Sequence, residues 1–111
     1  MVARHKFLVH APDDMVGVAV EDVPADSEVE ALIMENGRYI HIKTRQVVPL
    51  GHKVALRDIP EGTRVIKYGV AIGEASTDIQ AGDHVHVQNL QSLRWKKSVA
   101  RSENGQIVEI K

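Results

Sequence analysis

The chain has 111 residues, which fits one domain, and its 43% apolar and 26% charged residues are typical of a soluble globular protein. A formal charge of −1 gives no overall field for nucleic acid or an acidic membrane surface, and no apolar run approaches the ~18 residues of a membrane span. The absence of cysteine excludes disulfides, thiolate zinc sites, iron–sulfur clusters and a Cys nucleophile on this chain, and it fits a cytoplasmic protein.

The N-terminal half consists of short apolar runs separated by turn residues. The run at 15–20 predicts a buried strand, with a single helical turn begun by Asp13 or Asp14 as the alternative. Asn36-Gly37 predicts a hairpin with a type I′ turn, in which both central residues have positive φ. After it the chain alternates strictly, so that Ile40 and Ile42 face one side. The strands predicted in this half are residues 6–10, 15–20, 29–34 and 38–43.

One turn pattern occurs in three copies, at residues 22–29, 58–65 and 78–85. Each copy predicts the end of one strand, a tight turn and the start of the next. Gly62 and Gly82 supply the positive φ of the turn, and Asp26 replaces glycine in the first copy. The strands predicted in the second half are residues 46–50, 53–56, 64–68 and 84–87. Many short strands with turns about every ten residues predict an all-β domain.

The sharpest chemical feature is His84-Val85-His86-Val87. Alternation on a strand puts both imidazoles on one face and both valines on the other, so His84 and His86 are candidate ligands of one divalent metal ion. Asn89 continues the same face and is a candidate oxygen ligand or substrate-orienting group. The alternative is a half-buried strand whose polar side is solvated, because two histidines supply only part of a metal site.

Two further positions are candidates for a site. His52 follows a glycine and precedes Lys53, whose charge favours neutral imidazole, the form needed in a base or a metal ligand. The alternative is an ordinary surface loop. Lys67 and Tyr68 end a predicted strand and suit a carboxylate or an enolate oxygen. The alternative is a Lys that extends its amine to solvent beside a Tyr packed at the edge of the core.

Other polar clusters carry weaker signals. His10 precedes Asp13 and Asp14, but carboxylates are common in turns. His41 lies on an alternating face that we expect to be solvated. Residues 94–97 place a tryptophan among cations; four residues on a near-neutral chain are too few for nucleic acid, and partner docking is the better explanation. The sequence contains neither a phosphate-binding P-loop nor a G-x-S-x-G nucleophile elbow.

With these motifs in order, the chain resembles the SAF-type N-terminal domain of the altronate/galactarate dehydratase family. The resemblance covers residues 6–95 and is carried by GHK, by KYG followed by IG, and by HVHV-x-N, all within residues 51–89. Residues 7–23 and 89–95 are most similar to the (2R)-sulfolactate sulfo-lyase branch, in which the domain is a separate small subunit. Gln88 stands where the family has a further His, which argues against three histidine ligands from this one strand.

The resemblance implies a β-clip fold of short, bent strands over residues 1–95, followed by a C-terminal hairpin or partner-docking tail at 96–111. It also implies lyase chemistry on a 2-hydroxy acid, in which the proton α to a carboxylate is removed and sulfite or water leaves the β-carbon. A larger dehydratase-like subunit would supply the main pocket. The predicted roles are catalytic for His52, Lys67 and His84, substrate-binding for Lys53, Tyr68 and Asn89, and ligation of a divalent metal such as iron for His84 and His86.

Two other functions remain open at this stage. The first is a non-catalytic module that binds a carboxylated ligand or braces a partner enzyme, and the second is a stand-alone metal-binding protein. No nucleic-acid or membrane partner is expected, whereas an exposed β edge or residues 94–97 would allow either a homo-oligomer or a contact with another subunit. The lyase hypothesis requires that His52, His84 and His86 gather on a common surface.

Overall fold

The computed structural model describes residues 4–92, and this part of the chain contains β-strands and turns but no helix. It therefore has no helix that could cross a membrane. The strands are β1 (Phe7–Val9), β2 (Val16–Ala19), β3 (Glu28–Ile33), β4 (Tyr39–Lys43), β5 (Lys53–Ala55), β6 (Arg64–Lys67), β7 (Val70–Ala75), β8 (His84–Val85) and β9 (Leu90–Gln91). The mainly β prediction is confirmed, and the short, curled strands agree with a β-clip.

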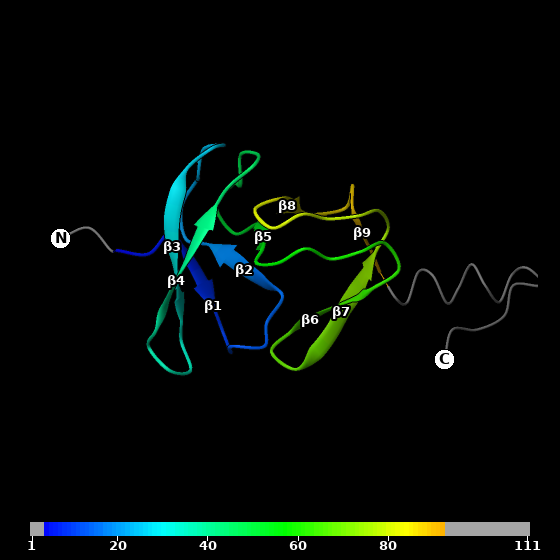
Figure 1. The fold of residues 1–111 in the computed structure, drawn as a ribbon, viewed down its shortest axis with the longest axis horizontal. Helices are drawn as coiled ribbons and strands as arrows, with labels where there is room; N and C mark the ends of the chain where they lie inside the picture. Colours follow the sequence, from blue (N-terminus) through cyan, green and yellow to red (C-terminus); the bar gives the residue numbers. More distant parts are fainter. Residues whose placement is uncertain (1–3, 93–111) are drawn as a thin grey trace, which may run out of the picture.

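The strands form two sheets that lie side by side in Figure 1. The larger has the order β4-β3-β1-β2-β5-β8 and the smaller the order β6-β7-β9. Only β1 and β3 run parallel; the other paired strands described are antiparallel. Two apolar clusters form the core: one around Phe7 lies within the larger sheet, and the other, around Ile59 and Ile79, is shared between strands of both sheets. Backbone bonding between Met15 N and Ile66 O, at 2.9 Å, joins β6 to the residue preceding β2.

The turn pattern occurs four times rather than three. Its apolar residues are Val23, Val48, Ile59 and Ile79, and they form two antiparallel bridges, Val23–Val48 and Ile59–Ile79. The residue three positions later has a positive φ in every copy, 58° at Asp26, 82° at Gly51, 88° at Gly62 and 92° at Gly82. The predictions for Asp26, Gly62 and Gly82 are confirmed.

Carboxylates fasten the turns to each other in pairs. Asp58 Oδ1 accepts a hydrogen bond from Ala81 N at 2.9 Å, and Asp78 Oδ1 accepts one from Glu61 N at 2.8 Å. In the other pair only one such bond forms, from Leu50 N to Asp22 Oδ1 at 2.8 Å, because the fourth turn begins with Val47 instead of Asp.

Each turn also crosses a buried small residue on another strand or loop. The backbone NH groups of Asp26, Gly51, Gly62 and Gly82 donate to the carbonyls of Thr44, Ala19, Ala75 and Ala55, respectively. At the first crossing the Thr44 hydroxyl accepts from Ser27 N at 2.9 Å and donates to Pro24 O at 2.6 Å. Alanine at the other crossings leaves room for the turn backbone to approach closely.

Several predicted elements differ from the structure. Residues 46–50 form the fourth turn, not a strand, because Val48 is buried in a bridge and Gly51 reverses the chain. Strand β7 was not predicted. The hairpin between β3 and β4 is confirmed, but only Gly37 has a positive φ there, so the type I′ prediction is wrong. Ile40 and Ile42 do face inward from β4. The predicted tail at 96–111 and the 94–97 segment lie outside the described residues.

Candidate functional site

Three histidines meet on one face of the β5–β8 pair. In this antiparallel pair Val54 lies opposite His84 and Lys53 opposite Val85; His52 directly precedes Lys53 and His86 directly follows Val85. The ring contacts show that all three imidazoles lie on the same side. The ring centroids are 4.4 Å apart for His52–His86, 5.1 Å for His52–His84 and 5.6 Å for His84–His86. His52 Nδ1 lies 2.9 Å from His84 Nε2.

His52 occupies a turn position where the other copies have ordinary turn residues. The equivalent residues in the other three turns are Ser27, Thr63 and Asp83. The His52 backbone keeps the turn bonds, donating to Pro49 O and accepting from Ala19 N at 2.9 and 2.8 Å. An imidazole that breaks a local pattern without serving the backbone indicates a functional residue.

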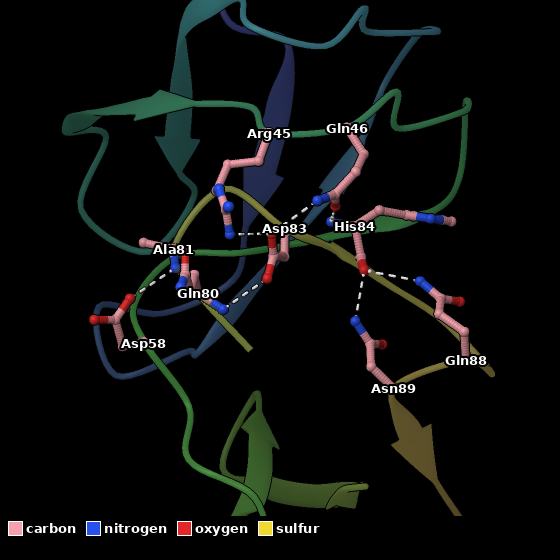
Figure 2. Close-up of polar contacts among 9 residues, drawn as sticks. All are labelled: Arg45, Gln46, Asp58, Gln80, Ala81, Asp83, His84, Gln88 and Asn89. Atoms are coloured by element: carbon pink, nitrogen blue, oxygen red, sulfur yellow. Dashed lines mark hydrogen bonds and ion pairs between the residues drawn. The ribbon is translucent and has the colours of Figure 1, made fainter. Parts of the chain in front are cut away.

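A buried carboxylate supports the start of β8 (Figure 2). Asp83 Oδ1 accepts hydrogen bonds from Arg45 and Gln46, both at 3.0 Å, and Oδ2 accepts one from Gln80 N at 2.7 Å. The side-chain oxygen of Gln46, Oε1, accepts a hydrogen bond from His84 N at 2.8 Å. Gln46 and Asp83 thus hold the backbone that carries His84. Sequence reasoning missed both, because Gln46 is 37 residues from Asp83 and 38 residues from His84 along the chain.

Asn89 holds the loop after β8 rather than extending the histidine face. Its Nδ2 donates to His84 O at 2.9 Å (Figure 2), and its Oδ1 accepts from His86 N at the same distance, so both ends of the amide serve the loop. Gln88 Nε2 also donates to His84 O, at 3.1 Å. Because the strand ends at Val85, Val85 is buried whereas Val87 is 82% exposed, and the prediction that both valines share one face of a strand is wrong.

The remaining predicted residues lie apart from the histidines. Lys53 pairs with Val85, the residue between His84 and His86, so alternation turns its side chain away from the imidazoles. Lys67 ends β6 and Tyr68 begins the turn to β7, at the opposite edge of the molecule from β8 in Figure 1. The structure therefore does not join Lys67 or Tyr68 to the histidine group within this chain, and their predicted roles stay predictions.

A second, structural cluster surrounds Tyr68. Its backbone has a φ of 54°, its side chain is 66% exposed, and its ring centroid lies 4.8 Å from that of His10. The idea that this ring packs at the core edge is therefore wrong. Asp14 is buried and accepts hydrogen bonds from Tyr68 N at 2.6 Å and His10 N at 3.1 Å. The carboxylate near His10 thus fastens two loops together.

The histidine group has the composition and spacing of a metal-binding set. One ligand nitrogen from each ring of His52, His84 and His86 lies within 4.8 Å of the others. Nitrogens bound to one tetrahedral zinc ion at ~2.0–2.1 Å are about 3.3 Å apart, so small side-chain rotations would suffice. Burial first, and then the neighbouring rings of His52 and His86, hold the pKa of His84 below its ordinary value of 6.5. Neutral imidazole is the form that binds a cation or accepts a proton.

The lowered pKa of His84 predicts an acid-sensitive fold. Because the unfolded chain binds a proton at His84 more readily than the folded chain, this residue's contribution to stability is complete above pH 6.5 and is lost as pH falls through the lower folded-state pKa. Urea unfolding in chelator-treated buffer between about pH 8 and 5.5 should show a declining unfolding free energy that is flatter in His84→Gln. Parallel profiles for the two proteins would contradict this assignment.

Comparison with known proteins agrees with the geometry. Residues 5–93 match the family model of the altronate/galactarate dehydratase SAF domain. The chain is 42% identical over 90 residues to the (2R)-sulfolactate sulfo-lyase subunit alpha of Chromohalobacter salexigens, covering 80% of this chain and 96% of that protein. It is 46% identical over 48 residues to the subunit of the same name from Paracoccus pantotrophus, covering 43% of this chain and 72% of that protein.

The same domain also occurs inside a longer protein. The chain is 44% identical over 84 residues to altronate dehydratase of Escherichia coli, covering 76% of this chain but only 16% of that enzyme. Since the family model covers most of the chain and the likeness to one relative spans nearly its full length, this protein belongs to the altronate/galactarate dehydratase SAF domain family.

Proposed function

We propose that this chain is the small subunit of a lyase that eliminates a β-substituent from a 2-hydroxy acid, with (2R)-sulfolactate as the first substrate to test. The observation that carries the proposal is the group of three imidazoles, His52, His84 and His86, on a protein 42% identical to a sulfolactate sulfo-lyase subunit alpha over 96% of that subunit. An altronate- or galactarate-type substrate that loses water is the alternative, supported by the altronate dehydratase relatives.

The relatives also support a larger partner. A subunit named alpha belongs to an enzyme with more than one kind of subunit, and the E. coli altronate dehydratase contains this domain as 16% of a single chain. The rest of the E. coli enzyme would correspond to a separate, dehydratase-like catalytic subunit that works with this chain. The absence of cysteine fits a pair that works in the cytoplasm.

The chemistry of elimination explains why imidazoles would be needed. Removal of the proton α to the carboxylate places negative charge on the carboxylate oxygens, and departure of sulfite from the β-carbon leaves an enol that tautomerises to a 2-oxo acid. The reaction therefore needs a proton acceptor and a positive group near the carboxylate. His52, His84 and His86 would together hold a divalent cation such as iron. When bound, that cation would withdraw charge from the substrate oxygens.

Each histidine has a supporting contact that suits this role. The bond from His84 N to Gln46 fixes one side of the group, the bond from His86 N to Asn89 fixes another, and the turn at Gly51 fixes His52. His86 is exposed whereas His52 and His84 are half-buried, so the open side of the group lies at His86. A substrate held by the large subunit would approach from that side.

Reconstitution of the pair tests the proposed function. The large subunit encoded with this chain should release sulfite from (2R)-sulfolactate only when the chain is added, and the His41→Ala variant, changed at an exposed strand residue outside the histidine group, should restore release as well as the wild type does. Altronate and galactarate, assayed for the 2-oxo product, identify the alternative substrates. Full sulfite release by the large subunit alone would show that this chain is not needed for catalysis and would leave it the role of a module that braces its partner.

A further inference from the structure

Three exposed apolar side chains lie on the two segments of the chain that carry the histidine group. Val47 is 55% exposed, Leu50 61% and Val87 82%. Leu50 precedes His52 by two residues, and Val87 follows His86 directly. Val47 follows Gln46, whose amide oxygen accepts the bond from His84 N. The loop before β5 and the loop after β8 that carry these residues lie at the same edge in Figure 1. We name Val47, Leu50 and Val87 the apolar rim.

The fold does not need apolar residues at these positions. The other three turns have Asp22, Asp58 and Asp78 where this turn has Val47, and these carboxylates stabilise partner turns through their Oδ1 atoms. Val47 therefore lacks the hydrogen bond that an aspartate accepts at this position in each of the other turns.

Leu50 and Val87 show the same departure. Where this turn has Leu50, the other turns have Ala25, Glu61 and Ala81, so a large apolar side chain occurs only beside the histidines. Val87 lies in a turn whose backbone is held by Asn89 and His86 rather than by apolar packing. Exposed apolar side chains that contribute nothing to folding, grouped around a functional site, indicate a binding surface.

We propose that the apolar rim is the docking surface for the large subunit, an inference that rests on the proposed function. In E. coli altronate dehydratase a peptide bond keeps the equivalent domain attached to the rest of the enzyme, because the match covers 16% of one chain. The C. salexigens subunit alpha is matched over 96% of its length, so it has almost no further chain with which to hold a partner. A subunit alpha of that length must bind its partner through the surface of the domain itself, and burial of apolar side chains is a major source of such affinity.

Docking at the rim also completes the site. Val87 of the rim directly follows the exposed His86, so a subunit seated on the rim would exclude water from the three imidazoles and strengthen their interactions with a charged substrate. Three histidines leave at least one position of a cation free for a group from the partner or the substrate. The same contact would thus assemble the complex and bring the two halves of the active site together.

The other exposed apolar residues provide a matched control. Met34 is 53% and Val70 60% exposed, and both lie near the ends of hairpins at the edge opposite β8 in Figure 1. Their exposure resembles that of the rim, whereas their position does not. A docking surface at the rim predicts that charge introduced at Val70 or Met34 leaves the complex intact.

The test uses substitutions that the fold already tolerates elsewhere. Val47→Asp and Leu50→Glu introduce the residues that stand at the equivalent positions of the turn at residues 58–65, Asp58 and Glu61, so neither should unfold the chain. Val87→Glu changes a fully solvated side chain. Titration calorimetry of each variant against the large subunit should show a Kd raised about tenfold or more for the rim variants, and less than about threefold for Val70→Glu and Met34→Glu.

The outcomes separate this inference from the proposed function. Wild-type affinity in all three rim variants, or equal losses in rim and control variants, would overturn docking at the rim. So would rim variants that abolish self-association of this chain without weakening the pair, because the rim would then join two copies of the chain. Sulfite release by the wild-type pair tests the function independently: a tight complex that needs the rim yet releases no sulfite would uphold docking and reject the lyase assignment.

Discussion

Replacing Gly82 with alanine is expected to unfold the domain, whereas the same change at Gly62 should leave it folded. The two glycines occupy equivalent positions in paired turns and have nearly equal φ angles of 92° and 88°. A Cβ on Gly82 would lie 2.0 Å from Lys43 O, a backbone atom, whereas a Cβ on Gly62 has nothing within 4 Å. The Gly62 variant should lose only the cost of an L-residue at positive φ, about 1–2 kcal/mol.

A small shift of the turn at Gly82 cannot relieve this clash. Its carbonyl accepts from Arg45 N at 2.8 Å, and the following Asp83 binds Arg45, Gln46 and Gln80, so the turn cannot move away from Lys43 without losing these bonds. We expect a loss above about 4 kcal/mol, a large part of the ~5–15 kcal/mol that stabilises a typical domain. Urea midpoints of both variants measure the difference. Equal losses at the two glycines would contradict the close crossing.

Removing any one of the three histidines is expected to weaken divalent-cation binding by the isolated chain about a hundredfold. Structural metal sites bind with a total of ~10–16 kcal/mol shared among their ligands, so one imidazole accounts for several kcal/mol. His52→Ala, His84→Ala and His86→Ala should show this loss in calorimetric titrations with Zn²⁺ or, without oxygen, Fe²⁺. His41→Ala, on the exposed face of β4, should bind as the wild type does.

Protons should compete with the cation in the same experiment. Because the pKa of His84 is held below its ordinary value by burial and by its neighbours, protons compete for this ligand at lower pH than they would for a free imidazole, and cation affinity should fall as pH is lowered. Cation affinity that is unchanged in every histidine variant, or that falls equally in His41→Ala, would show that the metal binds elsewhere. The three imidazoles would then be left with acid–base or structural roles.

Local features of the sequence predicted much of the fold. Gly62, Gly82 and Asp26 mark turns because only a few residue types accept positive φ, and strict alternation placed Ile40 and Ile42 toward the core. The fourth turn escaped notice because Val47 replaces the aspartate that marks the other three. The spacing of Pro49 and Gly51 was the remaining signal, since it matches that of Pro60 and Gly62.

The site depended on information that is not local. His84 and His86 were expected to share a face because they are two residues apart, but the approach of His52 follows from the register of β5 against β8, 32 residues away. The resemblance to a family grouped the three; composition and spacing alone did not. Asn89 was misplaced because strand alternation from His84 and His86 leads to residue 88, and residue 89 lies instead in a loop that its own amide closes.

Turnover by the reconstituted pair tests the central claim most directly, namely that His52, His84 and His86 act as one group in the elimination. Sulfite release from (2R)-sulfolactate should fall about a hundredfold or more when His52→Ala or His84→Ala replaces the wild-type chain, while the complex forms with unchanged affinity. Undiminished release with both variants would contradict the account and leave this chain a structural role only.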